Sequence, residues 1–130
     1  MASLVGIVLA LLVSGLAWWA GFDRDRAFYP TVLAVIASYY VLFAVMGGSA
    51  QALIAESAAM TLFVLVAVAG FKWNLWLVAA ALAGHGLFDQ LHGHLVTNPG
   101  VPPWWPPFCL AYDIAAAGFL GGLLARRGVR

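Results

Sequence analysis

Residues 2–21 read ASLVGIVLALLVSGLAWWAG, an apolar run without a charged side chain. A hydrocarbon layer about 30 Å thick needs roughly 20 residues of α-helix to cross it, so this run has the length of a membrane span. Runs of similar length recur along the chain with short polar breaks between them. The sequence predicts one transmembrane domain over residues 1–130, with spans at 2–21, 28–47, 50–71, 75–96 and 107–125.

The composition of the whole chain also indicates that lipid surrounds most of it. Of the 130 residues, 65% are hydrophobic and only 8% are charged, whereas a soluble domain is about half apolar and a quarter charged. A net charge of +1 with six basic residues is too small for a nucleic-acid-binding surface. The single cysteine excludes an internal disulfide. We therefore expect an all-α integral membrane protein with membrane lipid, and no nucleic acid, among its partners.

The basic residues indicate how the spans are oriented. With five spans, all of them fall on one side of the membrane: Arg24, Arg26, Lys72, Arg126, Arg127 and Arg130. Short loops rich in Lys and Arg stay on the cytoplasmic side. We expect a compact five-helix bundle in the plasma (inner) membrane, with the N-terminus outside and the C-terminus in the cytoplasm. Tryptophans near the span ends, including Trp104 and Trp105, are expected to anchor the bundle at the interfaces.

Two further segments carry expectations about packing. Five of the six prolines lie in residues 98–107, which predicts a non-helical outer loop at 97–107 that serves either as a lid or as a rigid connector. Gly118 and Gly122 form a GxxxG pattern, which is typical of closely packed membrane helices. That packing could occur within one chain, in a homo-oligomer or in a larger membrane complex.

Three carboxylates, those of Glu56, Asp89 and Asp113, lie inside predicted spans that contain no Lys or Arg near them. A charged carboxylate in hydrocarbon costs several kcal/mol, so such residues normally face the interior of a bundle, bind a proton or meet a cation. Counting from the outer span ends at 1.5 Å per residue, all three lie roughly 10 Å below the outer surface. Three helices therefore bring carboxylates to one level.

The span at residues 75–96 adds histidines. His85, Asp89 and His92 are spaced by four and then three residues, which places them on one helical face. Such spacing is similar to the paired ligands that bundle helices offer to metals. The sequence predicts a divalent metal site (zinc, iron or manganese) with Asp89 or Asp113 also serving as general base. The expected ligands are Glu56, His85, Asp89, His92 and Asp113.

Other interpretations of the same residues stay open. One or more carboxylates could be protonated, with the histidines hydrogen-bonded across the bundle, or the group could relay protons. Cys109 lies one turn from Asp113 and is either a further ligand or a small apolar filler. His94 points nearly opposite the other histidines and is expected at the interface. Tyr39, Tyr40 and Tyr112 each need a hydrogen-bond partner in lipid, and a carboxylate of the site is an available one.

The functional hypotheses follow from this group of residues. The first is a metal-dependent membrane enzyme, a hydrolase or an oxidoreductase, acting on an amphiphilic or lipid substrate. The alternatives are a small proton- or ion-coupled transporter and an accessory subunit of a larger membrane complex. Haem is not expected because all three histidines come from one helix, and no nucleotide-binding motif is present.

Overall fold

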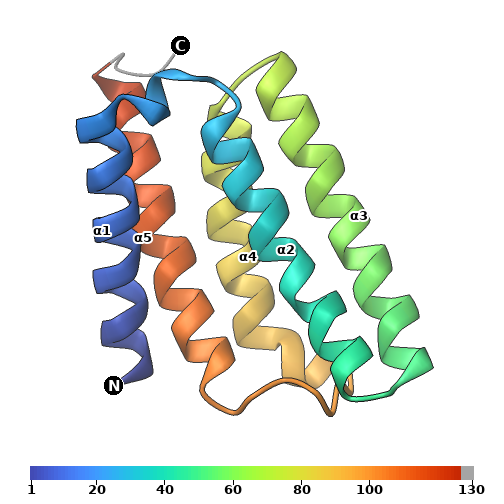
Figure 1. The fold of residues 1–130 in the computed structure, drawn as a ribbon. Coiled ribbons are helices and arrows are strands. Elements are labelled where there is room, and N and C mark those ends of the chain that lie inside the picture. Colours follow the sequence, from blue (N-terminus) through green and yellow to red (C-terminus); the bar gives the residue numbers. More distant parts are fainter. Residues whose placement is uncertain (127–130) are drawn as a thin grey trace.

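The computed structural model describes residues 1–126, which form five long helices running up and down beside one another (Figure 1). No strand occurs in this part of the chain. The helices predicted from the apolar runs are all present. Their bounds are α1 Ala2–Ala20, α2 Phe28–Met46, α3 Ala50–Lys72, α4 Trp76–Leu95 and α5 Trp105–Ala125, with a 3-10 turn, η1, at Phe22–Arg24.

Four of these helices, α1, α2, α3 and α5, are long and apolar enough to cross a membrane. Long apolar helices of this kind are typical of a membrane protein. Helix α4 is 20 residues long, but its polar side chains lower its hydropathy. Those side chains belong to His85, Asp89, Gln90, His92 and His94.

The helix ends follow from local sequence. Gly21 ends α1 in the left-handed region, at φ 87°, where glycine is favoured. The Ser49 hydroxyl begins α3 by accepting a hydrogen bond from the Ala52 N–H at 3.1 Å. Arg26 donates to the Phe71 carbonyl at 2.7 Å, at the end of α3 where carbonyls lack helical partners. The chain therefore turns sharply between helices without leaving these backbone groups unpaired.

Helix α5 begins earlier than the sequence predicts. We expected residues 97–107 to be non-helical because of their prolines, but α5 starts at Trp105, with Pro106 and Pro107 in its first turn. This part of the prediction is wrong because proline is tolerated where a helix has no N–H bonds to lose. Trp105 is also buried, at 8% exposure, and packs on Phe43 and Tyr39. It is therefore a packing residue, whereas Trp104 is 55% exposed.

Helix α5 packs against both α1 and α4, α2 packs against α3, and α4 also contacts α3 and α2. The core forms along these contacts, with the largest fully buried apolar side chains from α2, α4 and α5. They are Leu33, Tyr40, Val78, Leu82 and Leu120. Helix α1 is attached to the bundle mainly through α5, which leaves its other sides free.

Small residues bring α1 close to α5. The buried positions of α1 are Gly6, Ala10, Ser14 and Ala17, at helical spacing. A Cβ atom at Gly6 would lie 2.3 Å from the Phe108 carbonyl oxygen, so the two backbones nearly touch there. At Gly118 and Gly122, by contrast, an added Cβ would meet nothing within 4 Å. The close packing predicted from the GxxxG pattern is therefore not used inside the described chain, and a different glycine supplies it.

We expect Gly6→Leu to lower the free energy of unfolding by about 1–3 kcal/mol, the usual cost of overpacking. The added side chain has to push α1 away from α5. The matched control is Gly15→Leu on the same helix, where an added Cβ has open space. Thermal unfolding in detergent measures both. Equal stability of the two variants would contradict the close approach of α1 and α5.

All described basic side chains lie at one end of the bundle. Arg24 and Arg26 follow α1, Lys72 ends α3 and Arg126 follows α5, and these three ends lie together (Figure 1). The N-terminus, the turn between α2 and α3 and the proline loop lie at the opposite end. Arg127 and Arg130, which the sequence also assigned to the basic side, lie outside the described residues.

Candidate functional site

The site is built on the inward face of α4. Its buried residues form one stripe along the helix. This stripe is apolar at Val78 and Leu82 and polar at His85, Asp89 and His92. Spacings of three and four residues keep all of them on one face. The neighbouring helices add polar side chains of their own at the polar end of this stripe. They come from Tyr40 on α2, Glu56 on α3, and Cys109 and Asp113 on α5, each at most 2% exposed.

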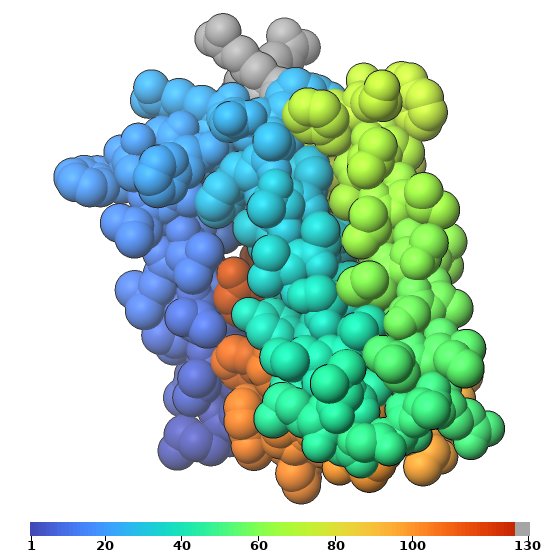
Figure 2. Space-filling view, turned by 45° about the vertical axis from the view of Figure 1, so that its right-hand side comes forward, coloured from blue at the N-terminus to red at the C-terminus, as the bar shows by residue number. Residues whose placement is uncertain are grey.

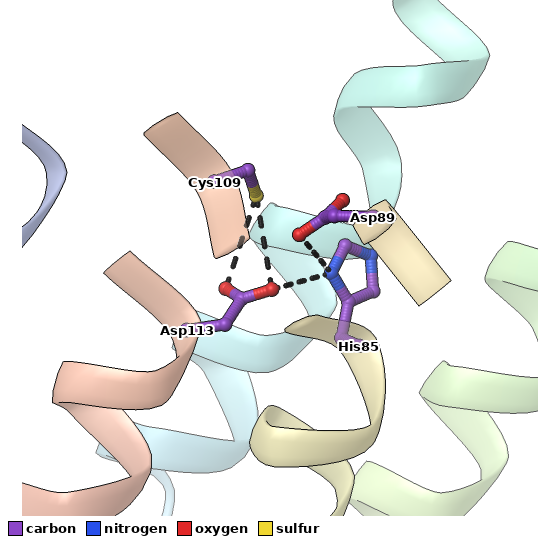
Figure 3. Close-up of side chains that lie close together, drawn as sticks. All are labelled: His85, Asp89, Cys109 and Asp113. Carbon is purple, nitrogen blue, oxygen red and sulfur yellow. Dashed lines mark hydrogen bonds and ion pairs between the residues drawn. The ribbon is translucent and has the colours of Figure 1, made fainter. Parts of the chain in front are cut away.

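One group within the site is the His85 cluster, which consists of His85, Asp89, Cys109 and Asp113 (Figure 3). His85 Nδ1 lies 2.7 Å from Asp113 Oδ2 and 3.5 Å from Asp89 Oδ2. Cys109 Sγ lies 3.8 Å from both Asp113 carboxylate oxygens. One possible ligand atom from each residue lies within 4.8 Å of all the others. This group could hold a metal ion.

The hydrogen bonds of the His85 cluster are incomplete. One imidazole Nδ1–H can serve only one of the two carboxylates well, and it lies much closer to Asp113. Asp89 Oδ2 is left buried without a hydrogen-bond partner among the described residues. A buried acceptor with no partner costs about 1–3 kcal/mol, and more if it is charged. A proton, a water molecule or a cation at this atom would satisfy it.

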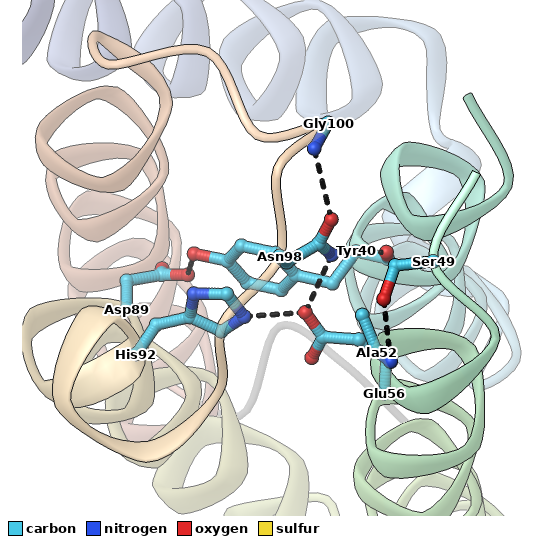
Figure 4. A network of polar contacts seen from close by, with 8 residues as sticks. All are labelled: Tyr40, Ser49, Ala52, Glu56, Asp89, His92, Asn98 and Gly100. Carbon is cyan, nitrogen blue, oxygen red and sulfur yellow. Dashed lines mark hydrogen bonds and ion pairs between the residues drawn. The ribbon is translucent and has the colours of Figure 1, made fainter. Parts of the chain in front are cut away.

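A second group, the Glu56 network, consists of Glu56, His92 and Asn98 (Figure 4). His92 Nε2 lies 2.5 Å from Glu56 Oε2, and the Asn98 amide donates to the same oxygen at 2.8 Å. Asn98 also donates to the Tyr40 carbonyl at 3.1 Å and accepts from the Gly100 N–H. These contacts tie the proline loop to α2 and α3, which supports its role as a rigid connector.

Tyr40 joins the two groups. Its hydroxyl donates to Asp89 Oδ1 at 2.6 Å, which confirms the expectation that a site carboxylate satisfies this buried tyrosine. Its ring stacks on the imidazole of His92, with ring centres 3.9 Å apart and planes at 10° (Figure 4). The polar side chains therefore form a connected chain from Asn98 in the loop to Asp113 on α5.

The structure does not bring the five predicted ligands around one point. It places His85, Asp89 and Asp113 together and adds Cys109, whereas Glu56 and His92 pair with each other in the neighbouring network. The two histidines lie at different positions along the axis of α4. The sequence spacing placed His85 and His92 on one face, but seven residues of α-helix separate them by about 10 Å along the axis. One ion cannot bridge that distance.

Sequence reasoning missed Asn98 and gave Cys109 and Tyr40 only secondary places. Asn98 precedes Pro99 and Gly100, so its pattern is that of a turn residue. Nothing in the sequence showed that its amide would reach α3. Cys109 carried a signal, since four residues separate it from Asp113 on the same helix face. His94 is exposed, as its position opposite the other histidines predicted.

The fold and the site together define a helical membrane protein with a buried cluster of histidine, carboxylate and thiol side chains that could hold a metal ion. Comparison with protein-family models, with curated protein sequences and with solved structures gave no significant match. The function of the chain is therefore inferred from the chemistry of the cluster itself.

Proposed function

We propose that this chain is a metal-dependent membrane enzyme whose divalent metal binds at the His85 cluster and whose substrate is an amphiphile that enters from the bilayer. The observation that carries the proposal is Asp89 Oδ2, which has only a 3.5 Å contact with His85 and no hydrogen bond among the described residues, and which is buried where histidine, thiol and a second carboxylate converge. A divalent cation there would satisfy both carboxylates at once. The hydrogen bonds among the described residues satisfy Asp113 but leave Asp89 Oδ2 without one.

The proposed topology has five spans, with the N-terminus outside and the basic end in the cytoplasmic leaflet of the plasma membrane. Consecutive helices run in opposite directions, so α4 has to return the chain across the same layer that α3 and α5 cross (Figure 1). Its polar residues are acceptable in a membrane because three of them face protein: His85, Asp89 and His92 are each at most 3% exposed. The positive-inside tendency supports the orientation.

The ligand atoms of the cluster restrict which metal ion can bind. Ligand atoms bound at about 2.0–2.3 Å in tetrahedral geometry lie about 3.3–3.8 Å apart, and the cluster atoms lie within 4.8 Å of one another. A small inward shift of side chains would therefore complete the coordination. A thiolate beside imidazole and carboxylate favours zinc or iron over manganese, which prefers oxygen ligands.

The residues of the cluster would divide the work. The bound metal would supply Lewis acidity, which polarises a substrate oxygen or a water. Asp113, close to both His85 and Cys109, is placed to be a ligand. Asp89 is held by Tyr40 through Oδ1, and its Oδ2 forms no hydrogen bond within the described chain, so it is placed either to complete the coordination or to accept a proton as general base.

Elemental analysis of detergent-purified protein tests this proposal, with about one zinc or iron ion per chain as the expected result. Supplying zinc or iron to the purified chain and then removing unbound ions guards against loss during preparation. A chain that stays metal-free after this treatment would contradict the proposal.

The connected polar chain favours a second candidate, a proton-coupled carrier. Hydrogen bonds in which a proton can move join Glu56 to His92 and Tyr40 to Asp89. Asp89 also contacts His85, whereas the contact of Tyr40 with His92 is ring stacking. Such chains of ionisable side chains within a membrane mark proton pathways in transporters. A metal would not be required for this role.

If the carrier role holds, Tyr40→Phe should lower pH-driven flux in liposomes about tenfold, equivalent to about 1.4 kcal/mol in the barrier. The change removes the hydroxyl beside Asp89 and keeps the ring that stacks on His92. Tyr39→Phe is the matched control, because that neighbouring ring packs on Trp105 instead. Wild-type protein that binds a metal and shows no pH-driven flux would reject the carrier.

A further inference from the structure

An elongated groove runs between α1 and α2, with α5 as its floor (Figure 2). Its volume is about 890 Å³, within the range of about 300–1,000 Å³ that is common for ligand pockets. The groove exists because α1 packs on α5 through Gly6 and its other small residues and does not close against α2. It opens sideways, toward the surface that faces lipid in a membrane.

The walls of the groove are apolar along most of its length. Leu9 and Val13 line it from α1, and Val32 and Ile36 line it from α2. Along α2 it extends from Phe28 to Tyr39, which is about 16 Å at 1.5 Å per residue. Half of a hydrocarbon core about 30 Å thick is about 15 Å. The groove therefore has the length and the lining of a site for one acyl chain of one leaflet.

Charge marks one end of the groove. Gly21 and Asp25 line that end, and the Arg24 side chain lies beside it, 3.8 Å from where a Cβ of Gly21 would be. The Asp25 carboxylate accepts a hydrogen bond from the Ala27 N–H at 2.9 Å. Within the described part of the chain, the Arg24 guanidinium forms no hydrogen bond or ion pair. A cation at the end of an apolar groove, at the level of lipid headgroups, is complementary to a phosphate.

The other end of the groove reaches the metal-binding candidate. Cys109 lines the groove, and its Sγ contacts the Asp113 carboxylate. Cys109 therefore belongs both to the wall of the groove and to the His85 cluster. An occupant of the groove would seal that wall of the cluster against the bilayer.

We propose that this groove binds a single phospholipid from the leaflet at the basic end, with its phosphate at Arg24 and one acyl chain lying along α1 and α2 toward Cys109. The binding depends on the groove and on Arg24, and not on a metal, so it stands apart from the enzyme proposed above. Lipid retention and metal content can therefore fail independently.

The test is native mass spectrometry. The protein is first equilibrated with vesicles of palmitoyl-oleoyl phosphatidylglycerol and phosphatidylcholine, then dissolved in detergent and released from the detergent in the spectrometer. We expect one phospholipid to stay bound to the wild-type chain. Val13→Trp fills the groove and should weaken retention at least about tenfold, or 1.4 kcal/mol. Leu12→Trp is the matched control, since Leu12 is 63% exposed on the same helix and does not line the groove.

Two further variants keep the test decisive if Val13→Trp disturbs folding. Arg24→Gln should weaken retention of the phospholipid, because the Arg24 side chain lies beside Gly21 at the end of the groove. Arg126→Gln changes an arginine at the same end of the bundle that is not beside a groove-lining residue, and it should not. Asp113→Asn should keep the lipid, whatever its metal content. Wild-type protein without bound phospholipid, or equal retention in Val13→Trp and Leu12→Trp, would overturn the proposal.

Discussion

Asp113→Asn is expected to reduce the metal bound to the purified protein from about one ion per chain to less than about a tenth of that, because the affinity of a buried site depends on its charged ligands. Asp113 lies 2.7 Å from His85 Nδ1 and next to Cys109, so it is the most central carboxylate of the cluster. The amide keeps the size of the side chain and removes its charge. Elemental analysis of variant and wild type, purified side by side, measures the effect.

Two control variants give this result its meaning. Asp25→Asn removes an exposed carboxylate far from the cluster along the chain and should leave the metal content unchanged. Glu56→Gln distinguishes a metal site at the four-residue His85 cluster from the five-ligand site predicted from sequence. We expect it to keep the metal, because Glu56 pairs with His92 and Asn98 instead. Loss of metal from Glu56→Gln alone, with Asp113→Asn unaffected, would reverse the assignment.

His92→Leu is expected to lower the free energy of unfolding by about 3–5 kcal/mol, the cost of removing one partner from a buried pair that includes a charge. The variant leaves the Glu56 carboxylate, 1% exposed, with Asn98 as its remaining partner. It also removes the ring on which Tyr40 stacks. Thermal and denaturant unfolding in detergent would show the loss.

The same helix supplies the control for this prediction. His94→Leu changes an exposed histidine two residues away and should alter stability by less than about 0.5 kcal/mol. Adding Glu56→Gln to His92→Leu should restore part of the lost stability, because a neutral carboxamide costs less to bury without a partner than a carboxylate does. A double variant less stable than His92→Leu would show that the carboxylate is not the source of the cost.

The fold was largely predictable because a bilayer imposes simple rules. Runs of about 20 apolar residues have to form helices, since backbone groups find no other partners in hydrocarbon. The helix ends followed from glycine, serine and the polar breaks. The start of α5 was predicted too late, because prolines at 106 and 107 break a helix only after its first turn. The packing of α1 on α5 was not predicted, since Gly6 belongs to no marked motif.

For the site, the sequence named the buried carboxylates and histidines but could not group them. Helical periodicity gives the face on which a side chain lies, and it placed His85, Asp89 and His92 correctly on the inward face of α4. Which atoms meet depends on the relative heights and rotations of separate helices. Those follow from packing over the whole bundle, which no short sequence pattern records.

The amino-acid sequence by itself determined that the chain is helical and apolar, with its basic residues gathered at one end and a few costly polar side chains directed inward. Hydropathy and periodicity are properties of a single segment, so they can be read from it. Only the tertiary structure decided that Cys109 joins His85, Asp89 and Asp113, that Asn98 reaches Glu56, and that α1 leaves a groove beside α2. Each of these depends on contacts between segments far apart in the chain, where side-chain size and close packing fix the geometry.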